Sequence, residues 1–555
     1  MNSIQFNSIQ FNRITLNFIF LLIPAIFLIY YVYSLGIYFL ICYFQISQIL
    51  KFQKLENCIF IFKNAFYKKF NFMEEIMSQK TTKRVFTRKS KLFLILVGMI
   101  LVLSCKNPLG DESGGSGGAG GGGSSGGQTI TNKDGKVFPS WYLTEQQQQT
   151  PYIQGPTIVF KSRGGNANTQ VYHIPAIIVA DNGNIVALGD NRHANSRDVG
   201  TKNGPIDIVY KISKDGGQTW SAEKTILPVS PNDDMTGINN KGDVSVFKCL
   251  SGKLVALAVS GGGFANGHNA ATPSRMVMSK SLDNGENWTQ WKEVGQDTVF
   301  NFMKTKNINR GFATSGRGTT LKSGRLATAM VGSTTGKLLN WVAYYLYSDD
   351  EGETWRLHPN MQTAQGTELL SEPKIVGELD DGKLLMSVRN GASKAGQQGH
   401  PRMYGVSADG GATWGTFDAP SSKKLGTWNN MLCGNVDSEA IIWTRAGEHD
   451  KTRILHLLTG PYFRRGMSFW VSVDGGRNFD KKLEILNTSS YPGKYTAGYN
   501  SIDVLGDGTV ITLAEEYNTS NTKVGDSDYD LVFRRYNMKA ITGEVYKTEW
   551  YKGIK

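Results

Sequence analysis

The sequence predicts an all-β fold, a six-bladed β-propeller. One observation is a short turn motif that recurs at near-constant spacing, with intervals of about 65 residues that suit four-stranded units. Its copies are SKDGGQTW (213–220), SLDNGENW (281–288), SDDEGETW (348–355), SADGGATW (407–414) and the degraded SVDGGRNF (472–479). The other observation is a pair of hydrophobic strands around a Gly-containing turn, which repeats in phase with this motif.

The turn motif itself is predicted to be structural. Its Asp can cap the turn by accepting backbone N–H groups, its second Gly can supply a positive φ, and its terminal aromatic residue can pack beneath the hairpin. We therefore expect these Asp residues to face turn backbones and not a substrate.

The number of blades follows from the returning strand of each hairpin. These strands begin at Gly183, Gly252, Gly324, Gly382, Thr452 and Gly508. Only the last has no turn motif after it, so we expect the sixth unit to be closed by pairing of the two chain ends. Six units of about 65 residues match the length from Thr157 to Lys555, and we assign residues 151–555 to the propeller domain.

The N-terminal part of the chain has a different composition. Residues 1–105 contain twelve Lys or Arg against three Asp or Glu, which gives +9 of the net charge of +13. The rest of the chain carries a net charge of +4 and has no basic patch that would predict a nucleic-acid partner.

A lipoprotein-type signal peptide is predicted over residues 73–105. Basic residues from Lys80 to Lys91 precede an apolar stretch, Leu92 to Leu103, and the sequence VLSC then ends at Cys105. Lipidation of Cys105 would give a secreted protein anchored at the bacterial outer membrane or cell surface, with membrane contact only through the lipid.

The regions on either side of this signal are assigned from composition. Residues 1–72 contain an apolar segment, Ile14 to Phe44, but a signal is rarely preceded by so long a region. We expect translation to start at Met73 or Met77, so that this extension is absent from the natural protein. Residues 106–150, which are rich in Gly and Ser at first, are predicted to form a flexible tether.

Cysteine usage in the folded part is sparse. Cys249 and Cys433 offer one possible pair, which makes neither a disulfide framework nor a metal-ligand spacing. We therefore expect no metal and no cofactor.

Hairpin geometry predicts which polar residues lie together. The start of a first strand and the end of its returning strand share one edge of the sheet. The expected neighbours are His173 with Asp190 and Arg192, Glu372 with Arg389, and Tyr499 with Glu515, while Arg464 and Arg465 fall at the same level. A lone Arg at a strand end is usually a solvated charge, but the common phase of the whole set favours an anion-binding catalytic pocket.

Three segments carry a resemblance to a known family: YHIPAIIVADNGNIVALGDNRHANSRDVG, SEPKIVGELDDGKLLMSVRN and AGYNSIDVLGDGTVITLAEEY. With the turn motifs, which match Asp-boxes, they make residues 157–551 resemble the bacterial exo-α-sialidases (neuraminidases). The resemblance implies hydrolysis of terminal sialic acid from glycoproteins, glycolipids and oligosaccharides, with retention through a tyrosine nucleophile.

The resemblance also implies a role for each residue of the set. Asp198 would be the acid/base, Tyr499 would be the nucleophile, and Glu372 would be the base that activates Tyr499. Arg389 and Arg464 would bind the sugar carboxylate as a clamp, with Arg465 as the substitute for Arg464. Arg192 and Asp190 would line the pocket near the sugar hydroxyls, and Glu515 would support the residue at the first position of the clamp.

The chemistry explains these residue types. Sialic acid carries a carboxylate on its anomeric carbon, so an anionic nucleophile would be repelled, whereas a neutral phenol can approach and then lose its proton. Arginine binds a carboxylate through paired charged hydrogen bonds.

One residue departs from the family pattern. His173 stands where the family has the first arginine of the clamp, and a neutral imidazole supplies neither the charge nor the planar fork. Losing one charged hydrogen bond costs about 1.5–3 kcal/mol. Glu515 could favour a protonated His173, or Arg192 could rotate inward to compensate.

Two alternatives stay open at this point. The chain could be a non-catalytic or weakened propeller that binds sialic acid or other acidic glycans, which His173 favours and which binding without release would reveal. It could also be another glycosidase that uses Asp198 and Glu372 as a carboxylate pair, in which case Tyr499→Phe would leave hydrolysis of neutral glycans undiminished.

Overall fold

The computed structural model describes residues 130–131 and 137–552, except 164–169, 194–195, 202–203, 227–239, 335–339, 364, 367, 395–396, 421, 488–495, 518–528 and 548. The expected extension (1–72), signal peptide (73–105) and lipidation site at Cys105 lie outside these residues. Within the described part of the chain, no helix has the length and apolarity needed to cross a membrane.

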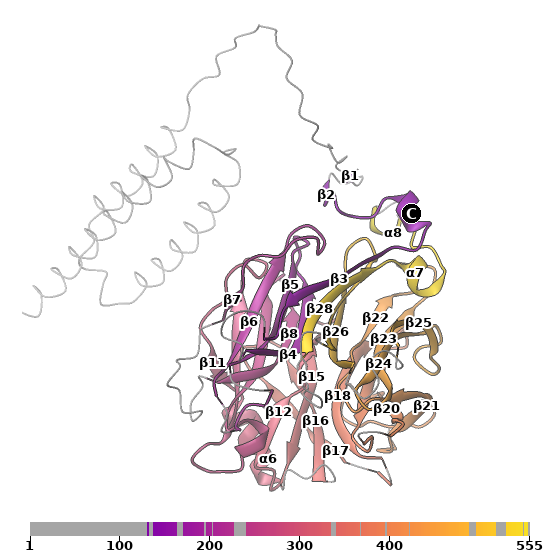
Figure 1. Ribbon diagram of the computed structural model, residues 1–555. Coiled ribbons are helices and arrows are strands. Elements are labelled where there is room, and N and C mark those ends of the chain that lie inside the picture. The colour runs from indigo at the N-terminus through magenta and orange to yellow at the C-terminus, as the bar shows by residue number, and fades with distance from the viewer. Residues whose placement is uncertain are drawn as a thin grey trace, which may run out of the picture. The chain divides into compact units, whose positions relative to one another are not determined.

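The described strands form a six-bladed β-propeller, as predicted (Figure 1). Each blade is an antiparallel sheet of four main strands, ordered from the inner to the outer strand. The blades are β4 (Val171–Val179), β5 (Ile185–Arg192), β6 (Ile206–Ser213), β7 (Lys224–Thr225); β8 (Lys241–Lys248), β9 (Leu254–Gly261), β10 (Ser274–Ser281), β11 (Lys292–Val294); β12 (Arg310–Ala313), β15 (Leu326–Ser333), β16 (Trp341–Ser348), β17 (Arg356–Thr363); β18 (Leu370–Glu378), β19 (Leu384–Asn390), β20 (His400–Ser407), β21 (Gly426–Cys433); β22 (Ala440–Thr444), β23 (Arg453–Tyr462), β24 (Arg465–Ser472), β25 (Asp480–Leu486); and β26 (Ala497–Val504), β27 (Val510–Tyr517), β28 (Tyr529–Tyr536), β3 (Ile153–Phe160).

Smaller elements join or cover these blades. They are β1 (Ile130–Thr131) paired with β2 (Val137–Phe138), β13 (Gly316–Arg317) parallel to β8, β14 (Thr319–Thr320) paired with β15, and the short helices α4 (Glu145–Gln148), α5 (Gly263–Asn266), η1 (Gln296–Phe300), α6 (Asn301–Thr305), α7 (Met538–Thr542) and α8 (Glu549–Lys552).

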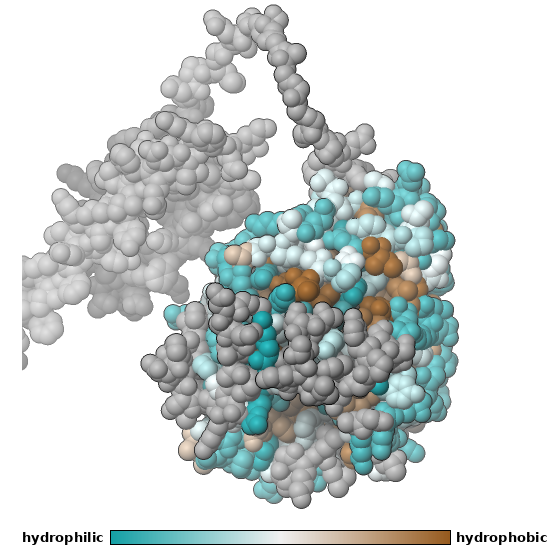
Figure 2. Space-filling model, viewed as in Figure 1, coloured by the Kyte–Doolittle hydropathy of each residue, from teal (hydrophilic) through white to brown (hydrophobic). Residues whose placement is uncertain are grey.

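The hydrophobic core lies between neighbouring blades. The second strands β5 and β9 are buried along their whole length, because both faces of each blade pack against another blade. One cluster joins Ile178 and Leu188 of the first blade to Val246 and Ala256 of the second. In the view of Figure 2, the outer surface is mainly hydrophilic with small apolar patches.

The turn motifs have the predicted structural role. In the fourth copy, the Asp409 carboxylate accepts the Ser407 hydroxyl at 2.7 Å and the Thr413 N–H at 2.8 Å. Gly411 has a φ of +96°, and Trp414 is 2% exposed beneath the hairpin. The motif therefore holds one end of each of the first five blades, the end that is remote from the residues predicted to form the pocket.

The ring closes through the chain ends. Strand β3 pairs with β28, so the sixth blade takes its outer strand from the N-terminal side of the domain, as expected (Figure 1). This pairing joins residues near position 158 to residues near position 532 and fixes the first blade next to the last.

The packed region begins before the predicted domain boundary at residue 151. Trp141 donates its indole N–H to the Lys214 carbonyl at 3.0 Å, and Leu143, 2% exposed, donates its N–H to Asp507 at 2.9 Å. Gln148 is fully buried and donates to the Asp507 carbonyl. Residues 137–149 thus lie across the turn ends of the first and sixth blades, which shortens the predicted tether.

Candidate active site

Four inner strands carry a β-bulge where their candidate site residues lie. The ladder register shifts between His173 and Ala176 in β4, between Gly242 and Ser245 in β8, between Leu370 and Pro373 in β18, and between Ala497 and Asn500 in β26. A bulge adds a residue on one strand and re-aims its side chain. The same device therefore presents one side chain from each of four blades at a common edge.

Tyr499, Glu372 and Arg389 form the centre of the candidate site. The Tyr499 hydroxyl donates to Glu372 Oε1 at 2.9 Å and accepts from Arg389 Nη1 at 2.7 Å. Arg389 also forms an ion pair with Glu372. The predicted proximity of Glu372 and Arg389 is confirmed, and Tyr499 joins them from another blade.

The Tyr499 phenol is held in its neutral form. Burial raises its pKa well above the ordinary value of 10, and Glu372 and Asp437 raise it further, while Arg389 and Arg464 oppose the shift without cancelling it. The phenol therefore keeps its proton at ordinary pH until an acceptor takes it.

Arg464, and not its neighbour, lies over the tyrosine. Its guanidinium carbon is 5.8 Å from the centre of the Tyr499 ring. Arg464 has a φ of +49°, while Arg465 begins β24 and stands opposite Tyr462 in the ladder. The turn thus separates the two arginines and gives Arg464 the predicted position.

Glu515 ties two bulged strands together from beneath. Its carboxylate accepts His173 Nδ1 at 3.0 Å and the Ile174 N–H at 2.9 Å through Oε1, and the Tyr499 N–H at 3.0 Å through Oε2. Burial alone would raise the pKa of Glu515, but His173, Arg464 and the Ile174 N–H outweigh it, so the pKa is lowered. The predicted neighbour relationship of Tyr499 and Glu515 is confirmed.

His173 is not turned into a cation by Glu515. Burial lowers its pKa below the ordinary value, Arg192 and Arg464 lower it further, and Glu515 only partly opposes them. The side chain is 4% exposed, and its Nε2 atom has no hydrogen-bond partner among the described residues. Glu515 therefore favours the protonated form of His173, as expected, but burial and the two arginines outweigh it and the pKa stays below its ordinary value.

Asp190 and Arg192 support the site more than they line it. Arg192 binds Asp190 Oδ2 at 2.9 Å and Asp198 Oδ1 at 2.8 Å, and Asp190 Oδ1 accepts the Asp243 N–H at 3.0 Å. Asp190 is fully buried with both oxygens bound, so the expectation that it lines the pocket is wrong. Arg192 is 2% exposed and engaged by these carboxylates, which leaves no inward rotation that would replace the missing arginine.

Asp198 presents an exposed carboxyl next to a buried arginine. Its side chain is 70% exposed beside the buried Arg192. This is the arrangement that proton exchange with an external group requires, because the carboxyl reaches solvent while a fixed cation orients it.

Two residues of the site were missed at the sequence level. Asp243, at the β8 bulge with a φ of +53°, has a raised pKa because it is buried and faces Asp190, Asp198 and also Glu372. Its carboxyl therefore feels the negative charges of both Asp198 and Glu372. Its position at the start of an inner strand, in phase with His173, is the signal that could have found it.

Asn435 is the second missed residue. Its Oδ1 accepts Arg389 Nε at 3.0 Å, and its Nδ2 donates to the Ser393 carbonyl at 3.0 Å. It has a φ of +59°, a conformation that asparagine tolerates better than most residues. Asn435 thus fixes the orientation of Arg389, and no strand pattern in the sequence marks it.

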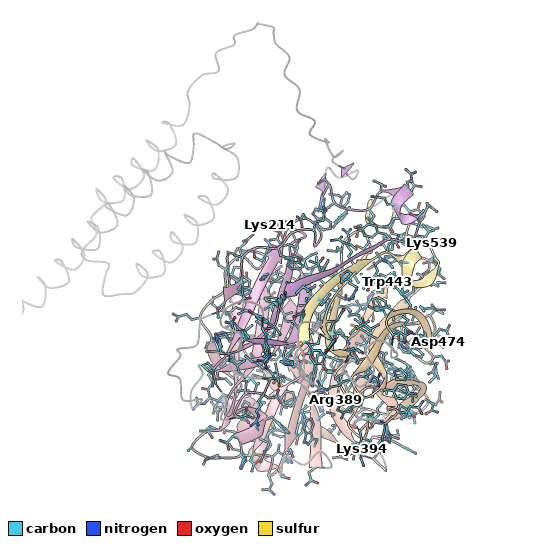
Figure 3. The ribbon with its side chains drawn as sticks, viewed as in Figure 1. Lys214, Arg389, Lys394, Trp443, Asp474 and Lys539 are labelled. Atoms are coloured by element: carbon cyan, nitrogen blue, oxygen red, sulfur yellow. The ribbon has the colours of Figure 1, made fainter. Side chains whose placement is uncertain are left out.

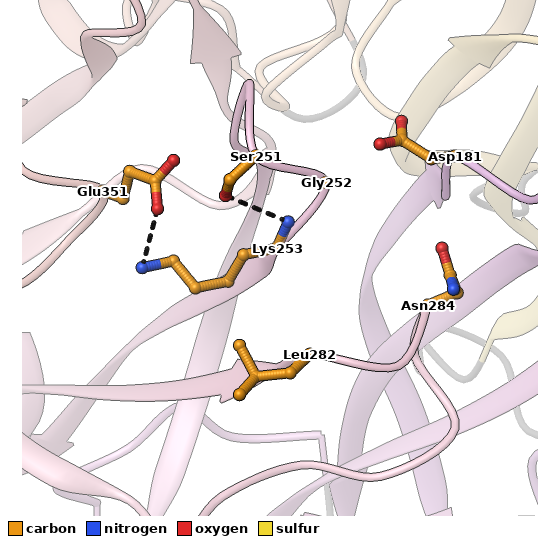
Figure 4. Close-up of a pocket in the computed structure, with 7 residues that line it drawn as sticks. All are labelled: Asp181, Ser251, Gly252, Lys253, Leu282, Asn284 and Glu351. Carbon is orange, nitrogen blue, oxygen red and sulfur yellow. Dashed lines mark hydrogen bonds and ion pairs between the residues drawn. The ribbon is translucent and has the colours of Figure 1, made fainter. Parts of the chain in front are cut away.

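Other features of the described residues do not compete with this centre. A surface cavity of about 450 Å³ lies at the turn ends, where Lys253 pairs with Glu351 at 3.1 Å beside Asn284 (Figure 4). Figure 3 labels Arg389 towards the middle of the propeller, and Lys214 and Asp474 of two turn motifs at its periphery. No group of three or more His, Cys, Asp or Glu among the described residues could hold a metal ion.

A comparison with models of protein families shows to which family this chain belongs. The BNR repeat-like domain matches residues 193–511, more than half of the chain. The chain belongs to the BNR repeat-like family. The curated proteins that the chain resembles include the sialidase of Paraclostridium sordellii, which is 26% identical over 50% of this chain and 65% of that protein. They also include the sialidase of Bacteroides fragilis, which is 25% identical over 58% of this chain and 56% of that protein. The resemblance to bacterial sialidases with BNR repeats is thereby confirmed, although the chain spans less than two thirds of either relative.

Solved structures support the fold of this BNR-repeat chain. A Hadza microbial sialidase has a TM-score of 0.53 at 20% identity, with 70% of each chain covered. The NanB sialidase of Streptococcus pneumoniae has a TM-score of 0.52 at 17% identity, covering 70% of this chain and 71% of its own. At these identities the likeness concerns the six-bladed propeller.

Proposed function

We propose that this BNR-repeat protein is an exo-α-sialidase that releases terminal sialic acid from glycoconjugates with retention, through a covalent bond to Tyr499. The observation that carries the proposal is the contact of the half-buried Tyr499 hydroxyl with Glu372 at 2.9 Å and with Arg389 at 2.7 Å. A tyrosine that is partly open to solvent and lies between an acceptor carboxylate and a guanidinium group is suited to act as a nucleophile towards an anionic sugar.

In the first step, the Tyr499 oxygen attacks the anomeric carbon while its proton passes to Glu372. The bond to the leaving sugar breaks, and Asp198 gives its proton to the glycosidic oxygen. In the second step, Asp198 takes a proton from water, whose oxygen attacks the same carbon. The bond between that carbon and the Tyr499 oxygen breaks, and Glu372 returns its proton to the released Tyr499 oxygen. Two displacements give net retention.

The positive charge of Arg389 and Arg464 explains the selection of a sugar acid. Both guanidinium groups lie within 6 Å of the Tyr499 ring centre, at 5.9 and 5.8 Å. A carboxylate on the anomeric carbon would meet them when that carbon reaches the Tyr499 oxygen. The neutral His173 supplies no third charge, so we expect weaker carboxylate binding than a three-arginine clamp gives.

We infer the substrate class of this chain from the names of its relatives. The curated relatives are named sialidases, and the Trypanosoma rangeli sialidase, 20% identical with a TM-score of 0.50, has been solved in complex with sialic acid. We take a terminal sialic acid as the substrate of this chain on the strength of these names together with the charge of the site.

The test is release of a fluorescent aglycone from a sialoside by residues 128–555, compared with Tyr499→Phe and Asp198→Ala. We expect release by the parent protein and a loss of at least about 10²-fold in Tyr499→Phe; for Asp198→Ala we expect a loss of that size when the leaving group is a sugar alkoxide, which needs the proton of Asp198. Binding of sialic acid without release would instead support the acidic-glycan-binding propeller that His173 favours.

We also propose that Cys105 carries a lipid that anchors the protein to the bacterial surface. The support is the basic, apolar and VLSC pattern of residues 80–105. Metabolic labelling with a fatty acid tests it: label should enter the parent protein and be absent from Cys105→Ser.

A further inference from the structure

The loop that carries Asp198 packs against a triple-glycine turn of the next blade. The turn is Gly261–Gly263, in which Gly261 ends β9 and Gly263 begins α5. Gly200 has a φ of +87°, and a Cβ on it would overlap the Gly262 carbonyl oxygen. A Cβ on Gly263, whose φ is +52°, would likewise overlap the Val199 carbonyl oxygen. The two backbones touch with no room for side chains between them.

Val199 anchors the same loop in an apolar cluster. It is 2% exposed and packs with Ile206 of the first blade, Val259 of the second, and Phe312 and Val331 of the third. A buried valine of this kind resists displacement because moving it would expose apolar surface or leave a cavity. The residue next to Asp198 is thus fixed by three blades.

Polar contacts hold the peptide of Asp198 from the other side. Thr201 donates to the Asp198 carbonyl through Oγ1 at 2.7 Å and through its N–H at 3.2 Å. Arg192 Nη1 donates to the Ser196 carbonyl at 2.7 Å and to Asp198 Oδ1 at 2.8 Å. A carboxyl that is 70% exposed therefore stands on a backbone that its neighbours hold in one place.

We infer that Val199, Gly200 and the Gly261–Gly263 turn are positioning residues that aim Asp198 at the leaving-group oxygen. The inference rests on the proposed function, because it concerns the proton that Asp198 gives and takes. A general acid must lie within hydrogen-bond reach of the oxygen that it protonates, and a shift of about 1 Å can cost 10²-fold in rate. Val199, Gly200 and the Gly261–Gly263 turn, which we call the seat of Asp198, supply this placement without contact with the sugar.

The inference predicts a dependence on the leaving group. A sugar alkoxide leaves poorly and needs the proton of Asp198, whereas a 4-nitrophenolate leaves readily without it. A displaced Asp198 should therefore slow the release of lactose from sialyllactose much more than the release of 4-nitrophenol from its sialoside. A general loss of folded protein would slow both reactions equally.

The test compares two seat variants with two matched variants at the opposite edge. Val199→Ala and Gly200→Ala disturb the seat. Val186→Ala removes the same atoms from a fully buried valine, and Gly285→Ala adds a Cβ at a φ of +89° against Val186 in a turn motif. Thermal unfolding of all four variants measures the stability cost separately from the kinetics.

We expect the seat variants to lose about tenfold or more in kcat/KM on sialyllactose and less than about threefold on the 4-nitrophenyl sialoside. The Val186 and Gly285 variants should change both substrates by the same factor. Equal losses on both substrates in the seat variants would overturn the inference while leaving the proposed hydrolysis intact. A parent protein that releases neither aglycone would instead count against the proposed function itself.

Discussion

The Tyr499 hydroxyl donates a hydrogen bond to Glu372 Oε1 across 2.9 Å, although the residues are 127 positions apart in the chain. Glu372→Gln should remove the proton acceptor and keep the shape. Because the pKa of Tyr499 is raised, little phenolate forms without a base. We expect a loss of about 10²–10⁴-fold in kcat on a sialoside, measured at saturating substrate with unchanged circular dichroism. Turnover within a few-fold of the parent would contradict a proton transfer to Glu372.

A second prediction concerns the missing charge at His173. His173→Arg should place a guanidinium group beside Glu515 and near Arg464, and so restore a third positive contact for the sugar carboxylate. We expect a gain of about ten- to hundredfold in kcat/KM on sialosides, since one charged hydrogen bond contributes about 1.5–3 kcal/mol. His173→Gln, which keeps a donor without a charge, is the control and should stay near the parent. An unchanged or lower value for the arginine variant would mean that the site is adapted to another ligand.

The turn motifs give a pH-dependent prediction for stability. Burial alone would raise the pKa of Asp409, but hydrogen bonds from Thr413 and Ser407 outweigh it and lower the pKa. The ionised carboxylate thus stabilises the fold above its unfolded pKa of about 3.9, and this contribution is lost as the pH falls through the folded value. Asp409→Ala should cost about 1 kcal/mol in urea unfolding at pH 7. The difference from the parent should shrink at pH 3, and a constant difference would contradict the assignment.

The N-terminal segment gives a prediction that separates stability from activity. Trp141 stacks with the Arg535 guanidinium at 5.2 Å, and its ring fills the space that a Cβ on Gly216 of the first turn motif would occupy. Trp141→Ala should lower the free energy of unfolding by about 2 kcal/mol, through lost packing and a lost cation–π contact. Activity per folded molecule should remain within twofold, because this turn lies at the edge away from Tyr499. A larger change in kcat would mean that the two edges are coupled.

Much of the fold was predictable because it repeats. Each turn motif fixes a blade end by local hydrogen bonds, as at Asp409, and hairpin pairing then determines which residues share an edge. This reasoning predicts that Glu372 lies beside Arg389 and Tyr499 beside Glu515, as the structure shows. Closure by pairing of the chain ends is also predicted, because the last returning strand has no turn motif after it, and β3 with β28 makes this pairing.

What the sequence did not predict depends on bulges and burial. The phase of a hairpin does not show that Asp190 is buried with both carboxylate oxygens hydrogen-bonded. It also does not show that burial lowers the pKa of His173 by more than Glu515 raises it. Asn435 holds a positive φ in the segment between β21 and β22, which no strand pattern marks, and the positive φ of Asp243 at the β8 bulge is not visible in the pattern that marks its strand. Such features arise where several blades meet, and local sequence carries little information about them.

The most direct measurement is mass spectrometry of the protein after reaction with a 2,3-difluorinated sialic acid, whose fluorine atoms slow release of the sugar from the enzyme. The proposed chemistry predicts a single added sugar on the peptide that contains Tyr499, and its absence from Tyr499→Phe. Turnover of sialosides with no label on that peptide, or with label on a carboxylate such as Asp198, would contradict a tyrosine nucleophile.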